Sequence, residues 1–200
     1  MLPWILSDAT LGNHVLEIGA GYGAGTPELL KRAGRVTSLE YDHNTLMKGN
    51  RSPDAQTASV LCGDAAHLPF ANETFSSVVG ILVLHHLRDQ ESQNLAFAEL
   101  LRVLQPGGTF FAFEINDTWF HRAIHYKSTF TPVSPGSAFA RLTGAGFARI
   151  SLDFRHGGYR LQAKRAKADD LSSDLHQAKV PDASHDMPLG LASIAKSAGN

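Results

Sequence analysis

The chain has 200 residues, of which 43% are hydrophobic and 18% charged, and its formal net charge is −1. This composition is typical of a globular domain with a sizeable core, and the near-neutral charge argues against nucleic acid or a membrane as a partner. The single cysteine, Cys62, excludes an internal disulfide framework, and no apolar run approaches the roughly 20 residues of a membrane span. Because the first residues lack the pattern of a signal peptide, we expect a cytoplasmic protein.

Short apolar runs alternate with segments of helical spacing over the first half of the chain. One or two helical turns are expected within Leu2–Ala9. The expected strands are His14–Ile18, Arg35–Asp42, Ala58–Ala65, Phe75–Leu87 and Thr109–Glu114, and the helices between them are Gly25–Gly34, His43–Arg51 and Gln90–Leu104. Because strands and helices alternate over short links, the sequence predicts a doubly wound, Rossmann-like α/β fold with a mostly parallel sheet.

The pattern changes toward the end of the chain. A helix is expected at Gly136–Phe147, followed by two strands, Ala148–Phe154 and Tyr159–Arg165. The intervening RHGG segment offers a glycine turn, so these strands are expected to form an antiparallel hairpin that closes the sheet. Residues 166–200 contain no aromatic side chain and have weak periodicity. We therefore expect one domain at residues 1–165 and a disordered tail at 166–200.

Three glycines at alternate positions follow the first expected strand, in the segment VLEIGAGYG. Folds that bind dinucleotides use G-x-G-x-x-G, where backbone amides meet a pyrophosphate at a helix N-terminus. The spacing of Gly19, Gly21 and Gly23 is G-x-G-x-G instead. This difference alone does not decide between a nicotinamide cofactor and another ligand.

Further motifs add to the glycine turn. They are LEYD at the end of the second strand, GDAAHLPF after the third, FSSVVGILVLHHL around the fourth and LLRVLQPGG before the fifth. Together, over about Val15 to Phe113, these segments resemble the class I S-adenosylmethionine-dependent methyltransferases in their small-molecule type 11 branch. The terminal hairpin fits the seven-stranded fold of that family. The resemblance implies S-adenosylmethionine as cofactor and transfer of its methyl group to a small-molecule acceptor by in-line displacement.

The resemblance also implies a set of cofactor-binding residues. S-adenosylmethionine carries a ribose diol, an adenine and an amino-acid tail, but no phosphate. Glu40 would accept the ribose hydroxyls, Asp64 the adenine amino group, and the Ala65 amide would bond the adenine ring. Glu17 would orient the methionyl ammonium, and glycine at the turn would let the backbone approach the tail without a Cβ clash. The remaining expected cofactor-binding residues are Gly19, Gly21, Gly23, Tyr41, Gly63 and Leu82.

These assignments have structural alternatives. Glu40 could be an exposed charge at a strand end, Asp64 a plain turn residue, and Glu17 a cap of the following turn. Tyr41 could pack on adenine or cover the sheet edge, and Leu82 could belong to the core.

The acceptor side is less defined. His85 and His86 follow the fourth strand, and either could act as a general base or only shape the pocket. His121 and His125 lack the glutamate of H-E-x-x-H, so no metal site is expected. Aromatic residues within Ile115–Pro135 could line an apolar acceptor site or form ordinary core. The absence of [DN]-P-P-[FYW] after the fourth strand disfavours nucleic-acid amines as acceptors.

Two other functions stay open. Only 14 residues precede Val15, so the cover at residues 1–13 is expected to be shortened, and a missing lid would weaken binding. A non-catalytic binding or regulatory protein with this fold is therefore the main alternative. A nicotinamide-dependent oxidoreductase is disfavoured by the glycine spacing, by Gly63-Asp64 and by the absence of a Tyr-x-x-x-Lys pair. The methylated atom (O, N, C or S) and the oligomeric state also stay open.

Overall fold

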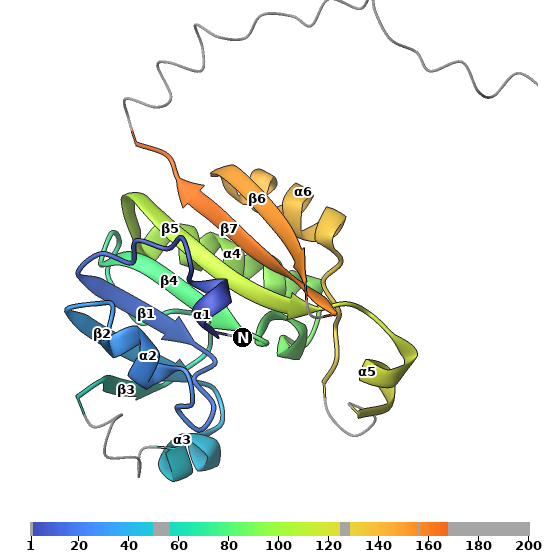
Figure 1. The fold of residues 1–200 in the computed structure, drawn as a ribbon, viewed down its shortest axis with the longest axis horizontal. Helices are drawn as coiled ribbons and strands as arrows, with labels where there is room; N and C mark the ends of the chain where they lie inside the picture. The colour runs from blue at the N-terminus through green and yellow to red at the C-terminus, as the bar shows by residue number, and fades with distance from the viewer. Residues whose placement is uncertain (1, 50–56, 125–128, 156, 168–200) are drawn as a thin grey trace, which may run out of the picture. The chain divides into compact units, whose positions relative to one another are not determined.

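The computed structural model describes residues 2–49, 57–124, 129–155 and 157–167. They form a seven-stranded sheet with the strand order β3-β2-β1-β4-β5-β7-β6 (Figure 1). The strands are β1 (His14–Ile18), β2 (Arg35–Glu40), β3 (Ser59–Cys62), β4 (Phe75–Ile81), β5 (Leu104–Ile115), β6 (Phe147–Arg155) and β7 (Gly158–Arg165). The helices are α1 (Leu2–Ile5), α2 (Thr26–Leu30), α3 (His43–Gly49), α4 (Gln90–Val103), α5 (Trp119–Ile124) and α6 (Pro135–Ala145), with a 3-10 turn, η2 (Leu84–His86). The tail expected at 166–200 lies almost wholly outside the described residues.

The strand pairing confirms the doubly wound sheet. β1 pairs in parallel with both β2 and β4, β2 pairs in parallel with β3, and β4 pairs in parallel with β5. β7 then pairs antiparallel with β5 and with β6, which confirms the expected hairpin. The chain leaves β1 in one direction for β2 and β3, and returns to the other side of β1 for β4. Ligands of open α/β sheets bind at such a reversal, outside the carboxyl ends of the strands.

The core has two layers because successive strand residues point to opposite faces of the sheet. Leu16, Val78 and Phe110 pack on the face covered by α4 and α6. Their chain neighbours Val15, Val79 and Phe111 pack on the face covered by α1 and α2, as Figure 1 shows. Burial on both faces explains why these strands read as continuous apolar runs rather than alternating ones.

The N-terminal segment covers part of the second layer. The Trp4 ring packs edge-on against Phe113 of β5, with ring centroids 6.1 Å apart. The guanidinium groups of Arg155 and Arg160 each lie 5.5 Å from the centre of the same ring. Ile5 is fully buried. The short segment before β1 is therefore packed onto the central strands and the hairpin.

Several element boundaries differ from the expected ones, and the differences are largest at β4, β5 and α2. β4 ends at Ile81 rather than Leu87, because Leu82 adopts a φ of 56° and the next residues turn into η2. α2 ends at Leu30, four residues before Gly34. β5 begins at Leu104, and its register with β4 shifts between the Phe75–Leu104 pair and the Ser77–Thr109 pair. The Pro-Gly-Gly segment within β5 thus forms an irregularity in the strand instead of preceding it.

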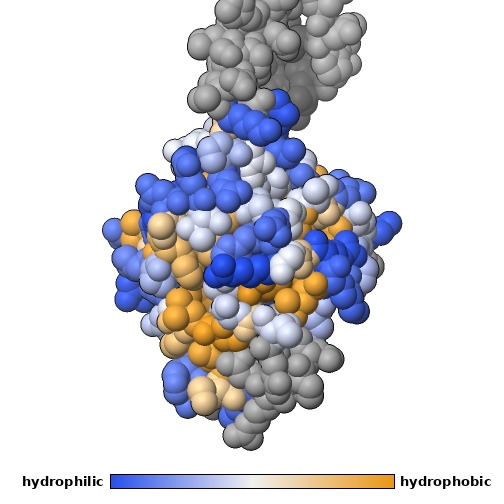
Figure 2. Space-filling model, turned by 90° about the vertical axis from the view of Figure 1, so that its left-hand side faces the viewer, coloured by the Kyte–Doolittle hydropathy of each residue, from blue (hydrophilic) through white to orange (hydrophobic). Residues whose placement is uncertain are grey.

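The surface is mixed in character. Figure 2, seen from the side of the molecule that carries β2 and β3, shows hydrophobic areas interrupted by hydrophilic residues. β3 is an edge strand, and three of its four residues, Ser59, Leu61 and Cys62, are exposed. Within the described ranges, no helix is long and apolar enough to cross a membrane.

Candidate cofactor and acceptor site

A cavity of about 540 Å³ opens at the carboxyl ends of the first four strands. It lies where the strand order reverses. The expected cofactor-binding residues that line it are Gly19, Gly21, Glu40, Tyr41, Gly63, Asp64, Ala65 and Leu82. The structure therefore brings together residues that are spread over more than sixty positions of the sequence. Two members of the expected set lie elsewhere: Glu17 and Gly23 line neighbouring, smaller cavities.

The glycine turn has a backbone that other residues rarely adopt. The φ angles of Gly19, Gly21 and Gly23 are 65°, 56° and 81°, all in the left-handed region that favours glycine. A Cβ atom on Gly19 would also collide with the side chain of Val83, whereas one on Gly21 would meet nothing within 4 Å. Position 19 thus requires glycine for two reasons, and position 21 requires it for conformation alone.

Glu40 connects the end of β2 to the glycine turn. Its Oε2 accepts a hydrogen bond from the Gly21 amide at 2.8 Å, and its Oε1 accepts one from the Asp42 amide at 3.0 Å. These bonds hold the carboxylate at the cavity wall. Because a carboxylate has about four acceptor positions, Glu40 keeps the capacity to accept hydroxyl groups of a ligand.

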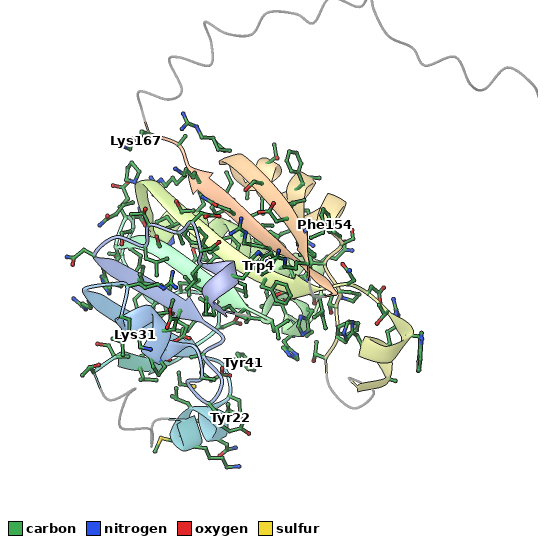
Figure 3. The ribbon with its side chains drawn as sticks, viewed as in Figure 1. Trp4, Tyr22, Lys31, Tyr41, Phe154 and Lys167 are labelled. Carbon is green, nitrogen blue, oxygen red and sulfur yellow. The ribbon has the colours of Figure 1, made fainter. Side chains whose placement is uncertain are left out.

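Asp64 follows β3 and lines the same cavity as the glycine turn. Its Oδ1 accepts a hydrogen bond from the Ala66 amide at 2.8 Å, so it does serve as a turn residue. The Gly63 amide donates to the Glu40 carbonyl at 2.9 Å, which joins the ends of β2 and β3. Tyr41 is 75% exposed, and Figure 3 places it with Tyr22 at the end of the sheet near α3.

The charge of the cavity lining favours hydroxyl and amino groups over phosphate. Two carboxylates, Glu40 and Asp64, line it, and among the described lining residues Arg88 supplies the one Lys or Arg side chain. Arg88 is itself paired with Asp89, with 3.2 Å between Nε and Oδ2. A site for a pyrophosphate would need donors where this cavity offers acceptors.

Glu17 has a different environment from the one expected. Its side chain is nearly buried beside a cavity of about 250 Å³ that Ile5 and Ile81 also line. Its Oε2 accepts hydrogen bonds from the hydroxyls of Thr26 and Ser38, both at 2.7 Å. Burial raises the pKa of the Glu17 carboxyl. Glu17 thus joins β1 to the first turn of α2 and to β2, and Gly19 lines both this cavity and the larger one.

The structure separates the two adjacent histidines. His86 is exposed and lines the large cavity, with its Nδ1 3.3 Å from the Thr129 carbonyl oxygen. His85 is 2% exposed and is not among the residues that line the cavity. Its Nδ1 lies 2.5 Å from Oε2 of Glu114, at the end of β5.

Glu114 is a residue that the sequence reasoning missed. Like Glu17 and Glu40, it is an acidic residue near the carboxyl end of a strand, and that shared position was a signal that could have found it. Only 1% of its surface is exposed, so its carboxyl group needs hydrogen-bond partners within the protein.

The segment after β5 contributes little to the cavity among its described residues. Trp119 is 80% exposed, and Phe130 packs against the His85 ring, with centroids 5.5 Å apart. The Nδ1 atom of His121 lies 2.7 Å from the Asn116 carbonyl oxygen, while His125 falls outside the described residues. In the part of the chain that the structure covers, no group of three or more His, Cys, Asp or Glu residues is arranged to hold a metal ion.

Similar proteins are found by sequence and by fold. A family model described as a methyltransferase domain matches residues 16–112. A probable S-adenosylmethionine-dependent methyltransferase of Mycolicibacterium smegmatis is 32% identical over 189 residues, which cover 82% of this chain and 68% of that protein. The demethylmenaquinone methyltransferase of Thermobifida fusca is 35% identical over 104 residues, 50% of this chain and 43% of that protein. The chain thus spans less than half the length of this second relative.

The fold is shared with solved structures. A phosphoethanolamine N-methyltransferase of Haemonchus contortus, solved with phosphomonomethylethanolamine and S-adenosylhomocysteine, superimposes with a TM-score of 0.69 at 14% identity. The match covers 83% of this chain and 52% of that one. With the seven-stranded sheet and the matched sequence segments, these similarities show that the chain belongs to the class I S-adenosylmethionine-dependent methyltransferases, in their type 11 branch.

Proposed function

We propose that this chain binds S-adenosylmethionine in the 540 Å³ cavity and transfers its methyl group to a small-molecule acceptor. One observation carries the proposal: the sheet brings the glycine turn, Glu40 and Asp64 to a single cavity at the reversal of strand order. The acidic lining suits a cofactor with a ribose diol and an adenine amino group but no phosphate. When bound, this cofactor supplies a methyl group on a positively charged, already activated sulfur.

Each of the expected cofactor-binding residues has a role in this proposal. Glu40 would accept the two ribose hydroxyls, because its carboxylate is fixed by two backbone amides and still has acceptor positions. Asp64 would accept the adenine amino group, and the Ala65 amide would donate to the ring. Gly19 and Gly21 would admit the amino-acid tail close to the backbone. Tyr41, Gly63 and Leu82 would form the walls, and Gly23 and Glu17 would support the turn and the tail from the neighbouring cavities.

The chemistry asked of the protein is then mostly positioning and exclusion of water, since the donor is activated in itself. Where the acceptor carries a proton that must leave, His86 would take it, because this histidine lines the cavity.

The relatives support a small-molecule acceptor. The protein of Thermobifida fusca is named for demethylmenaquinone, and the Haemonchus contortus structure holds phosphomonomethylethanolamine. In this chain, Leu82, Val83 and Leu87 contribute apolar surface to the cavity. That surface favours an acceptor with an apolar part.

Calorimetric titration of the full chain tests the cofactor. We expect S-adenosylmethionine and S-adenosylhomocysteine to bind with roughly micromolar affinity, and NADH not to bind. Glu40→Ala and Asp64→Ala should each weaken binding about tenfold or more, because each removes a charged acceptor. Glu28→Ala is the matched control, because it removes a half-buried carboxylate of α2 that pairs with Lys31 and Arg32, just after this helix, and that lines neither of the two larger cavities.

Transfer itself is tested by following S-adenosylhomocysteine release in the presence of mixed small-molecule acceptors. Binding of NADH in place of the sulfur cofactors would contradict the proposal and favour an oxidoreductase. Tight binding of S-adenosylmethionine without release on any acceptor would favour a non-catalytic binding protein.

A further inference from the structure

The pair formed by His85 and Glu114 is the most deeply buried contact between two titratable side chains in the described part of the chain. The side chains are 3% and 2% exposed, and 2.5 Å separates Nδ1 from Oε2. They come from different elements: His85 lies in η2 and Glu114 near the end of β5. A buried carboxylate needs hydrogen-bond donors within the protein, and the His85 ring lies beside one of its two oxygens.

The second oxygen of Glu114 holds the backbone where β4 ends. Oε1 accepts hydrogen bonds from the amides of Val83 and Leu84, at 3.0 and 2.8 Å. Just before them, the Leu82 amide donates to the Phe113 carbonyl at 2.8 Å. Leu82 itself has a φ of 56°, which a leucine adopts only when its surroundings impose it. Residues 82–84, which we call the corner, are therefore bonded first by the backbone of β5 and then by the Glu114 carboxylate.

This corner forms part of the wall of the large cavity. Leu82, Val83 and His86 all line it. The Val83 side chain also lies against Gly19, so closely that a Cβ atom there would not fit. A shift of the corner would therefore move the wall against the glycine turn, where we place the tail of the cofactor.

His85 also contacts the segment that follows α5. The Thr131 amide donates to the His85 carbonyl at 2.7 Å. The buried Gln93 side chain donates to the Thr131 carbonyl at 2.8 Å and to the Leu84 carbonyl at 3.0 Å. Thr129, two residues earlier, lines the cavity. The corner and this side of the cavity are thus fixed to one another.

We propose that His85 and Glu114 are positioning residues: His85 orients the Glu114 carboxylate, which holds residues 82–84 in the shape that forms the cavity wall. His85 then acts through Glu114 and does not touch the acceptor, whereas the adjacent His86 faces the cavity. The proposal deepens the function proposed above and rests on it for the identity of the ligand. The geometry of the corner in the free protein does not depend on that ligand.

The test compares substitutions that keep or remove the donor at Nδ1. The side-chain amide of His85→Asn places an N–H close to the position of Nδ1, and His85→Leu removes it at similar volume. Arg165→Met is the matched control for stability, because Arg165 donates hydrogen bonds to the carbonyls of Leu101 in α4 and of Leu104 at the start of β5, the opposite end of that strand from Glu114. Two quantities are measured on the full chain: amide hydrogen exchange of Val83 and Leu84 by NMR, and the affinity for S-adenosylhomocysteine by calorimetry.

We expect His85→Leu to raise the exchange rates of both amides about tenfold or more and to weaken binding by a similar factor. His85→Asn should stay within about threefold of the wild type in both measurements, and Arg165→Met should leave both unchanged although it lowers the melting temperature. Unchanged exchange in His85→Leu would overturn the proposal. So would equal losses in the Asn and Leu variants, because the ring and not its donor would then be required.

A further variant decides the outcome if His85→Leu does not fold. Glu114→Gln keeps an oxygen for the two amides but presents an NH₂ group to His85. The proton should then leave Nδ1, and the ¹⁵N resonance of that atom should move to the range of an unprotonated ring nitrogen. An unmoved resonance would refute the pairing. If the wild type itself binds no S-adenosylhomocysteine, the proposed function fails, while exchange in the free protein still decides the role of the pair.

Discussion

Substitution of Gly19 is a sharp test of the structure, because an added Cβ atom would be unfavourable for two independent reasons: the backbone conformation and the contact with a neighbouring side chain. Replacing it by alanine places a Cβ atom on a residue with φ 65° and presses that atom into the Val83 side chain. The left-handed backbone costs about 1–2 kcal/mol. The overlap adds about 1–3 kcal/mol, as for other overpacked sites. We therefore expect Gly19→Ala to lower the free energy of unfolding by about 2–5 kcal/mol.

Two other glycines separate these costs. Gly21→Ala carries the backbone cost alone, because nothing lies within 4 Å of the added atom, and should lose about 1–2 kcal/mol. Gly144→Ala, in α6 with open space around it, should be neutral or gain up to about 1 kcal/mol. Thermal unfolding followed by circular dichroism measures the series, and 1 kcal/mol corresponds to roughly 2–4 °C for a domain of this size.

The ranking of the two turn variants decides the matter. If Gly19→Ala is no less stable than Gly21→Ala, the contact between Val83 and the glycine turn is wrong. The affinity for the cofactor product is a second, independent measurement, because the methyl group added in Gly21→Ala lies at the cavity wall. That variant should lose affinity for S-adenosylhomocysteine by more than its small loss of stability suggests.

Three further predictions concern single side chains. Burial raises the pKa of the Glu17 carboxyl above its value of 4.5 in the unfolded chain, so this group stabilises the folded state below pH 4.5, and the contribution is lost as the pH rises through the pKa of the folded state. The free energy of unfolding of Glu17→Gln relative to wild type, measured by urea titration, should therefore increase with pH above 4.5. A difference in free energy that does not change with pH would contradict the raised pKa. Tyr159→Phe removes the 2.7 Å hydrogen bond to the Val133 carbonyl and should cost about 1–3 kcal/mol in thermal unfolding. Arg102→Lys loses a fork of bonds to Glu99 and to nearby carbonyls and should cost about 1–3 kcal/mol in the same assay, whereas a loss below about 0.5 kcal/mol would show the fork to be solvated.

Much of the sheet follows from local patterns. The strands of the parallel part and the hairpin are set by apolar runs and glycine turns, which are short-range signals. The end of β4 is not set by such a signal, because Val83 and Leu84 continue the apolar run although the strand has already ended at Ile81. The amides of these two residues bond instead to the Glu114 carboxylate, which is 31 and 30 positions away in the sequence, and no local pattern reports a partner at that distance.

The same distinction applies to the site. The grouping of Gly19, Glu40 and Asp64 at one cavity follows from the rule that parallel strands share a carboxyl end. That His85 is buried while His86 lines the cavity does not follow from such a rule, because a 3-10 turn has no simple alternation of inward and outward positions. The setting of Glu17 was equally out of reach, since it depends on the hydroxyls of Thr26 and Ser38 from two other elements.

The position of β7 between β5 and β6 has a consequence for how the protein is made. β5, which is mostly buried, keeps an unpaired edge until Gly158–Arg165 has been synthesised. At a synthesis rate of roughly 5–20 residues per second, the edge of β5 stays unpaired for about several seconds. Arg160 in the same strand also donates hydrogen bonds to Trp4 and Asp8, so these residues gain those partners only after β7 has been synthesised. A nascent chain halted before Gly158 therefore presents an open apolar edge, which is the kind of surface that aggregates or recruits holding chaperones.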